Sequence, residues 1–204
     1  MKQFILRNNL NLLAALGIGV AIYLSVNWSV MPVLQRSVGL FFVALVLHVW
    51  EEMRYPGGFA EMVTRRLNFA LPNRYAAESI VAGYVLYLVF VPLFFPHVPW
   101  LAMASMLLGV LEAIAHLAEI KIFRRKYSYS PGLVTAVLLL LPIATYGISY
   151  AVRQDLMRPL DWVWSLLYMA IGFAIAQGTV VRMSGLEYLD FLKRVRSVLF
   201  AKQT

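Results

Sequence analysis

The sequence predicts an all-α integral membrane protein, a helical bundle of about six transmembrane helices followed by a C-terminal amphipathic helix. Three observations predict this fold class: 61% of the 204 residues are hydrophobic, only 14% are charged, and the apolar residues gather in six long stretches. Soluble domains contain roughly 45–50% apolar and about 25% charged residues. The composition therefore excludes a soluble enzyme, and the absence of cysteine excludes a disulfide scaffold and a thiolate metal site.

Each predicted span is an apolar segment of roughly 20 residues, the length that crosses the hydrocarbon core of a bilayer. The six segments are 10–30, 33–50, 76–95, 100–122, 131–152 and 160–181. The first is longer than the apolar core of a signal peptide, about 7–15 residues, and no clear cleavage motif follows it, so we expect a retained helix. The third ends at the helix-breaking run Phe95-Pro96-His97-Val98-Pro99, and Pro131 suits the first turn of the fifth.

Two further segments are expected to form amphipathic helices on the membrane surface, and we treat 1–204 as a single domain. In the tail, 184–204, apolar residues recur at spacings of three and four between basic residues, a pattern typical of an interfacial helix. After the second span, Pro56-Gly57-Gly58 ends the helix sharply, because glycine adopts positive φ freely. The following stretch, 59–70, is expected to lie flat as a short amphipathic helix.

The distribution of basic residues predicts the orientation. Fifteen of the 18 Lys and Arg residues fall in the two chain ends and in the connections after the second and fourth spans. The other three are Arg36, Arg153 and Arg158. Because cytoplasmic flanks carry an excess of Lys and Arg, we expect both termini in the cytoplasm and the protein in the bacterial inner (plasma) membrane. The net charge of +8 then reflects attraction to the bilayer's anionic leaflet and not to nucleic acid.

Most of the acidic residues and histidines fall at one predicted depth, near the cytoplasmic ends of three spans. Seven such residues share this depth: His48, Glu51, Glu52, Glu78, Glu112, His116 and Glu119. Spacings of three, four and seven place those of the second span on one helix face, and those of the fourth span likewise. Intramembrane carboxylates cost about 3 kcal/mol unless they are paired, hydrated or bound to metal. We therefore expect a functional cluster.

These residue types indicate a divalent metal site, because imidazole and carboxylate from facing helices bind zinc, manganese and non-haem iron. We expect His48, Glu112 and His116 as ligands, with Glu119 or Glu52 as a fourth, and zinc as the metal, with iron or manganese next. Glu51, or else Glu52, is expected to act as the catalytic general base. Arg54 is expected to orient a carboxylate or to bind an anionic head group, and Glu78 to belong to the same cluster.

The cluster could also be a structural network without metal. In that interpretation Glu51 pairs with Arg54, and Glu119 pairs with Arg124 or Lys121.

Three functional classes are compatible with the sequence. The first is a metal-dependent hydrolase acting on a lipid or membrane-linked substrate, and the second is a metal-independent membrane protease. Glu51-Glu52 followed by Arg54 faintly resembles the Glu-Glu-x-x-x-Arg signature of CAAX endopeptidases, with the Arg two residues early. The third is a non-enzymatic transporter, ion-handling or assembly protein.

The run from His48 to Phe59, His-Val-Trp-Glu-Glu-Met-Arg-Tyr-Pro-Gly-Gly-Phe, resembles the signature of the HXXEE family of bacterial and archaeal membrane proteins. A later Glu-x-x-x-His of that family is matched by Glu112 and His116. Its Asn-Pro-Gly-x-x-Thr is matched in part by 130–135, with Ser130 in place of Asn. The resemblance implies a metal-dependent or hydrolase-like membrane protein and supplies no substrate.

Overall fold

The structure is a computed structural model that describes residues 2–122 and 129–200. Helices make up its secondary structure and no strand occurs in these residues, so the all-α prediction is confirmed for them. Within these described residues, six helical segments are long and apolar enough to cross a membrane. In chain order they are α2 (Asn9–Asn27), α3 (Val33–Met53), Arg74–Phe94, α6 (Pro99–Ile122), Leu133–Arg153 and α9 (Pro159–Met183).

Two of the six segments are interrupted by π-helical turns. Arg74–Phe94 consists of α5 (Arg74–Val85), η1 (Leu86–Phe90) and η2 (Val91–Phe94), and Leu133–Arg153 consists of α7 (Leu133–Thr135), η3 (Ala136–Leu140) and α8 (Leu141–Arg153). A proline, Pro92 or Pro142, follows each π turn, and proline clashes with the carbonyl four residues earlier. The freed carbonyl of Leu88 accepts a hydrogen bond from Ser105 Oγ at 2.8 Å, which satisfies this backbone group inside the bundle.

The fifth span begins two residues later than the sequence predicts. Pro131 was expected in the first helical turn, but α7 begins at Leu133. Gly132 has φ = +99°, a left-handed conformation that a right-handed helix cannot contain. Pro131 therefore belongs to the loop before the helix. This loop hydrogen-bonds the two histidines of the candidate site.

Helix α3 forms the centre of the bundle and packs against α2, α6 and α8. Its Phe41 and Phe42 are fully buried. A Cβ at Gly109 of α6 would lie 2.5 Å from the Phe41 ring, so the close approach of α3 and α6 requires glycine at this position. In contrast, α9 and the fifth span leave large apolar side chains such as Leu138 and Ile175 exposed, as helices facing lipid would.

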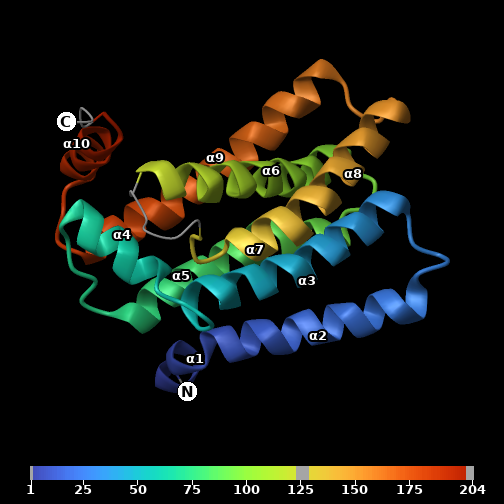
Figure 1. The fold of residues 1–204 in the computed structure, drawn as a ribbon. Helices are drawn as coiled ribbons and strands as arrows, with labels where there is room; N and C mark the ends of the chain where they lie inside the picture. Colours follow the sequence, from blue (N-terminus) through green and yellow to red (C-terminus); the bar gives the residue numbers. More distant parts are fainter. Residues whose placement is uncertain (1, 123–128, 201–204) are drawn as a thin grey trace.

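The surface helices and both chain ends lie at one end of the bundle. Figure 1 shows α1 (Lys2–Arg7), α4 (Phe59–Leu67) and α10 (Tyr188–Leu199) at its left end, together with the N- and C-termini. The helices expected in 59–70 and in the tail are thus present, and Leu67 and Phe191 pack together between them. The orientation stays a prediction, which reporter fusions at the C-terminus and in the 153–158 loop would test. Four residues of the basic count lie outside the described residues: Arg124, Arg125, Lys126 and Lys202.

Candidate metal centre

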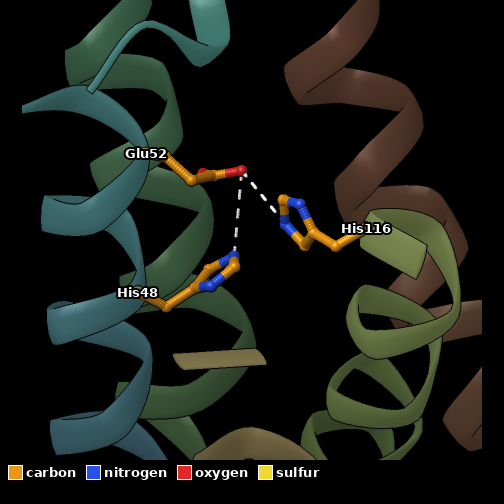
Figure 2. Close-up of side chains that lie close together, drawn as sticks. All are labelled: His48, Glu52 and His116. Atoms are coloured by element: carbon orange, nitrogen blue, oxygen red, sulfur yellow. Dashed lines mark ion pairs between the residues drawn. The ribbon is translucent and has the colours of Figure 1, made fainter. Parts of the chain in front are cut away.

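Two buried histidines from different helices meet at the end of the bundle that carries the termini. His48 of α3 and His116 of α6 are 2% and 1% exposed, and their ring centroids lie 5.1 Å apart. Glu52, one turn after His48, lies between them: its Oε1 is 3.8 Å from His48 Nε2 and 3.5 Å from His116 Nε2 (Figure 2). One ligand atom from each residue lies within 4.8 Å of the other two, so this trio could hold a metal ion.

A second carboxylate faces the same pair of ring nitrogens. Glu112 Oε2 lies 3.8 Å from Nε2 of His48 and 3.8 Å from Nε2 of His116. The Glu112 side chain is 29% exposed, whereas that of Glu52 is 10% exposed. We call these four residues, His48, Glu52, Glu112 and His116, the His/Glu centre. The structure therefore brings together four of the residues that the sequence singles out.

The other ring nitrogen of His48 is held by the loop before α7. His48 Nδ1 lies 3.1 Å from the carbonyl oxygen of Gly132 and 3.0 Å from Thr135 Oγ1. A carbonyl only accepts hydrogen bonds, so Nδ1 carries the proton and donates it. In the neutral ring Nε2 then presents a lone pair toward Glu52 and Glu112.

His116 is oriented in the same way by Ser130 and Glu119. Ser130 Oγ donates to Glu119 Oε2 at 2.5 Å, so its free lone pairs accept from His116 Nδ1 at 3.2 Å. Glu119 Oε2 is itself 3.4 Å from Nδ1. On the opposite side of the ring, Nε2 is buried and has no hydrogen-bond partner among the described residues. Metal-binding histidines are typically oriented through their second nitrogen in this manner.

Glu51 points away from these nitrogens and anchors the start of α7. Its Oε1 accepts from Tyr129 Oη at 2.9 Å and from the Val134 N–H at 3.2 Å. Its Oε2 accepts from the N–H and the hydroxyl of Thr135, at 2.8 and 2.5 Å. The first N–H groups of a helix have no partner within that helix, so Glu51 satisfies two of them and holds α7 against α3. Its expected role as general base stays a prediction.

Gly132 lies directly against both imidazole rings. A Cβ built at this position would lie 2.6 Å from Cε1 of His116 and 2.8 Å from Cε1 of His48. Any side chain at residue 132 would therefore displace one of the rings. Together with φ = +99°, this contact makes glycine necessary for the observed arrangement of the two histidines.

The same segment of the chain carries a family signature. The sequence family described as "Protein of unknown function with HXXEE motif" matches residues 39–147, more than half of the chain. The chain belongs to the HXXEE family. In the motif His48-Val49-Trp50-Glu51-Glu52, the histidine and the second glutamate face the His/Glu centre, whereas the first glutamate holds α7. Searches among curated proteins and among solved structures gave no match.

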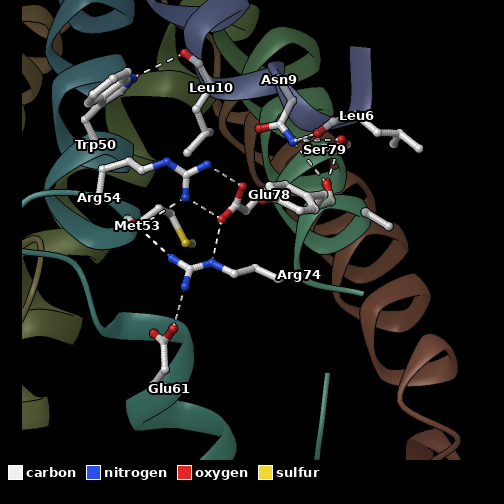
Figure 3. Close-up of polar contacts among 12 residues, drawn as sticks. Leu6, Asn9, Leu10, Trp50, Met53, Arg54, Glu61, Arg74, Glu78 and Ser79 are labelled. Carbon is white, nitrogen blue, oxygen red and sulfur yellow. Dashed lines mark hydrogen bonds and ion pairs between the residues drawn. The ribbon is translucent and has the colours of Figure 1, made fainter. Parts of the chain in front are cut away.

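Glu78, which is predicted to belong to the cluster, and Arg54, which is expected to orient a carboxylate or bind an anionic head group, lie in a separate network of this HXXEE protein. Glu78, with 2% of its side chain exposed, accepts two hydrogen bonds from Arg54, at 2.7 and 2.8 Å, and one from Arg74 Nε at 2.8 Å (Figure 3). Arg74 also pairs with Glu61 at 2.7 Å. The hydrogen bonds with Glu78 raise the pKa of Arg54, which stays protonated. We call these four residues the arginine network.

The predicted alternative of an ion pair between Glu51 and Arg54 is wrong. Arg54 pairs with Glu78, and Glu51 accepts hydrogen bonds from the start of α7. The side chains of Lys121 and Arg124, the partners suggested for Glu119, lie outside the described part of the structure.

The sequence alone predicted no roles for Ser130, Gly132 and Thr135. The signal that could have found them is the partial match of 130–135 to the Asn-Pro-Gly-x-x-Thr pattern of HXXEE proteins.

Proposed function

We propose that this protein is a membrane-embedded, metal-dependent hydrolase that acts on a lipid or membrane-linked substrate at the cytoplasmic face. The observation that supports it most is the arrangement of the two histidines. In each ring Nδ1 is fixed from outside the centre, and Nε2 faces Glu52 and Glu112. The Nε2 of His116 is buried and has no hydrogen-bond partner in the described part of the chain, as expected of an imidazole nitrogen that is kept for a metal.

The residues present fit a metal ion. Two imidazoles and a carboxylate are a known ligand set of catalytic zinc, and iron or manganese come next. Four ligand atoms about 2.1 Å from a tetrahedral zinc lie about 3.4 Å from one another. The separations of 3.5–3.8 Å from Glu52 Oε1 to the two Nε2 atoms are close to this value and longer than the usual N–H···O distance of about 2.9–3.0 Å.

The contacts and exposure of the carboxylates suggest which of them binds the metal and which acts as the general base. We assign His48, His116 and Glu52 as ligands, and Glu112, the more exposed carboxylate, as the general base that takes the proton of the attacking water. A bound zinc would supply the water at a lowered pKa of about 7. Glu119 orients His116. Glu51 holds α7 and points away from the ring nitrogens, so we propose Glu112 as the base in place of Glu51 or Glu52, which the sequence favours.

Metal content of purified protein tests this proposal. His48→Ala and His116→Ala should each lose the metal, whereas Glu112→Gln should keep it and lose hydrolysis of lipid esters. His97→Ala is the matched control, because this histidine lies in the loop before α6, away from the centre. Equal metal content in the wild type, both His variants and the control would overturn the assignment of the ligands.

One observation favours the non-enzymatic alternative, an ion-handling or transport protein. The helix break of α7 and η3 directly follows the loop that holds the two histidines, and transporters often bind ions at interrupted helices. Proteoliposomes that take up zinc, with no lipid hydrolysis by the same preparation, would favour this alternative. Loss of that uptake in His116→Ala, but not in His97→Ala, would assign it to the same centre.

A further inference from the structure

An apolar cavity of about 560 Å³ opens beside the His/Glu centre. It lies among α5, α6 and α9, and its walls are mainly aliphatic and aromatic side chains, among them Ile80, Val81, Leu108, Leu111, Met169 and Phe173. Volumes of about 300–1,000 Å³ and mostly apolar walls are typical of small-molecule sites. The cavity therefore has the size and lining of a binding site for an apolar ligand.

The cavity joins the centre to the outside of the bundle. Glu52, Glu112 and His116 form part of its lining, so a molecule inside it would touch the centre. Leu111 and Phe173, which also line it, are 47% and 50% exposed. These two residues belong to predicted spans, so the cavity reaches a surface that would face lipid. A ligand from the bilayer could enter there without passing through water.

Tyr84 gives the cavity a hydrogen-bond donor that no other described residue uses. Its hydroxyl is buried and has no hydrogen-bond partner within the described parts of the chain, although it lines the cavity with Glu112. The nearby Tyr87 and Tyr168 differ, because each donates to the backbone carbonyl of the other, at 3.2 and 2.5 Å. An unsatisfied buried hydroxyl is destabilising, so the position of Tyr84 is explained if a ligand oxygen accepts a hydrogen bond from it.

We propose that this cavity binds the single hydrocarbon chain of a fatty acyl ester, with its carbonyl oxygen hydrogen-bonded to Tyr84 and its ester bond beside Glu112. This inference rests on the proposed hydrolase function and names its substrate class. Water adds to the carbonyl carbon and gives a proton to Glu112, the bond from that carbon to the ester oxygen breaks, and the proton passes to the leaving alcohol. A fatty acid and an alcohol result.

The lining argues against a membrane peptide as the occupant. A peptide would bring backbone N–H and C=O groups that need partners in an apolar site. Apart from the acidic residues and His116, the polar side chains lining the cavity are Tyr84 and Gln177, and Gln177 already accepts a hydrogen bond from Tyr188 Oη at 2.8 Å. The carbonyl oxygen of an acyl ester needs one hydrogen-bond donor, which the Tyr84 hydroxyl supplies.

Photo-crosslinking tests the binding separately from catalysis. Metal-stripped protein in nanodiscs is exposed to palmitate with a terminal diazirine, and the labelled residues are mapped by mass spectrometry. Ala176 lines the cavity, whereas Ala174, on the same helix, does not and is exposed. Ala176→Phe should lower labelling of cavity residues at least fivefold, and Ala174→Phe should leave it within twofold. Ala115→Leu, on the α6 wall, replaces Ala176→Phe if that variant does not fold.

Labelling spread over the outer surfaces of the spans, or unchanged in the filled-cavity variants, would overturn the inference while leaving the metal proposal intact. Tyr84→Phe should keep labelling and lower turnover of a palmitoyl ester by about 10²–10³-fold, the usual cost of removing one donor to a carbonyl oxygen. Tyr87→Phe, outside the cavity, should stay within about threefold of the wild type on the same reasoning. Cavity labelling without ester hydrolysis in the wild type would refute the hydrolase but not the bound chain.

Discussion

The His/Glu centre and the arginine network differ in how completely their charges are paired, although both attach to the same end of α3. In the arginine network the distances are 2.7–2.8 Å and both oxygens of Glu78 are bound by arginine. In the His/Glu centre the carboxylate oxygens lie 3.5–3.8 Å from the ring nitrogens, and the buried Nε2 of His116 lacks a hydrogen bond among the described residues. The first cluster is complete by itself, and the second is arranged for a ligand.

The surroundings of the two clusters differ in what their hydrogen bonds connect. Near the arginine network, Asn9 of α2 donates to the carbonyl of Tyr75 and to Ser79 Oγ, both at 3.0 Å, and Trp50 donates to the carbonyl of Leu10 at 3.2 Å (Figure 3). These bonds connect α2, α3 and α5. Around the His/Glu centre, hydrogen bonds are instead made to Nδ1 of each imidazole ring, on the side away from the centre. The network thus fastens helices, whereas the centre orients side chains.

Removal of the central carboxylate of the network should have the largest effect. Glu78→Ala leaves Arg54 and Arg74 without their shared partner, and breaking a buried ion pair costs about 3–5 kcal/mol. The exposed Glu61→Ala is the control, with an expected cost of up to about 1 kcal/mol. Unfolding of both variants in detergent would measure the difference. Equal stability of the two would contradict the structural role of the network.

A methyl group at residue 132 should separate metal binding from stability. Gly132→Ala places a Cβ against both imidazole rings, so metal affinity should fall about 10–100-fold, as when the orientation of metal ligands is lost. Gly58→Ala is the matched control, because Gly58 has a similar φ of +94° and nothing within 4 Å of its Cβ. Both variants carry the same backbone strain, and only the first should lose affinity in a zinc competition titration. A parallel loss in Gly58→Ala would attribute the effect to strain alone.

A smaller effect is expected from the partner of His116. Ser130→Ala removes the hydroxyl between His116 Nδ1 and Glu119, so metal affinity should fall about tenfold while the fold persists. Ser37→Ala is the control, since Ser37 is also buried and bonds only the carbonyl of Val33 in its own helix, among the contacts described. The same titration measures both variants. Wild-type affinity in Ser130→Ala would show that Glu119 alone orients the ring.

The fold could be predicted from the sequence because each crossing requires about 20 apolar residues, and such a segment is evident without knowing what it packs against. His48, Glu52, Glu112 and His116 could be predicted because spacings of four place residues on one helix face. Spacing could not decide which of Glu51 and Glu52 faces the centre. That choice depends on α7, whose contact residues lie more than 80 positions away in the sequence.

Spacing also could not predict that Glu78 and Arg54 form a network separate from the His/Glu centre. Glu78 and Arg54 lie at the predicted depth of the centre, and depth alone does not give position around the bundle axis. Arg74, one turn before Glu78, was assigned only to the basic flank, although its Nε completes the pairing of that carboxylate. The contact of loop 130–132 with both imidazole rings was likewise not predicted, because a loop with a left-handed residue such as Gly132 shows no periodic pattern in the sequence.

A metal site of the kind proposed here requires that the two Nε2 atoms of the His/Glu centre bind one metal ion. X-ray absorption at the zinc edge of purified protein tests it most directly. We predict imidazole scattering from two histidines, nitrogen and oxygen ligands at about 2.0–2.2 Å, and one imidazole fewer or no bound zinc in His116→Ala. An absorption spectrum with no imidazole ligand, or one unchanged in His116→Ala, would contradict the claim.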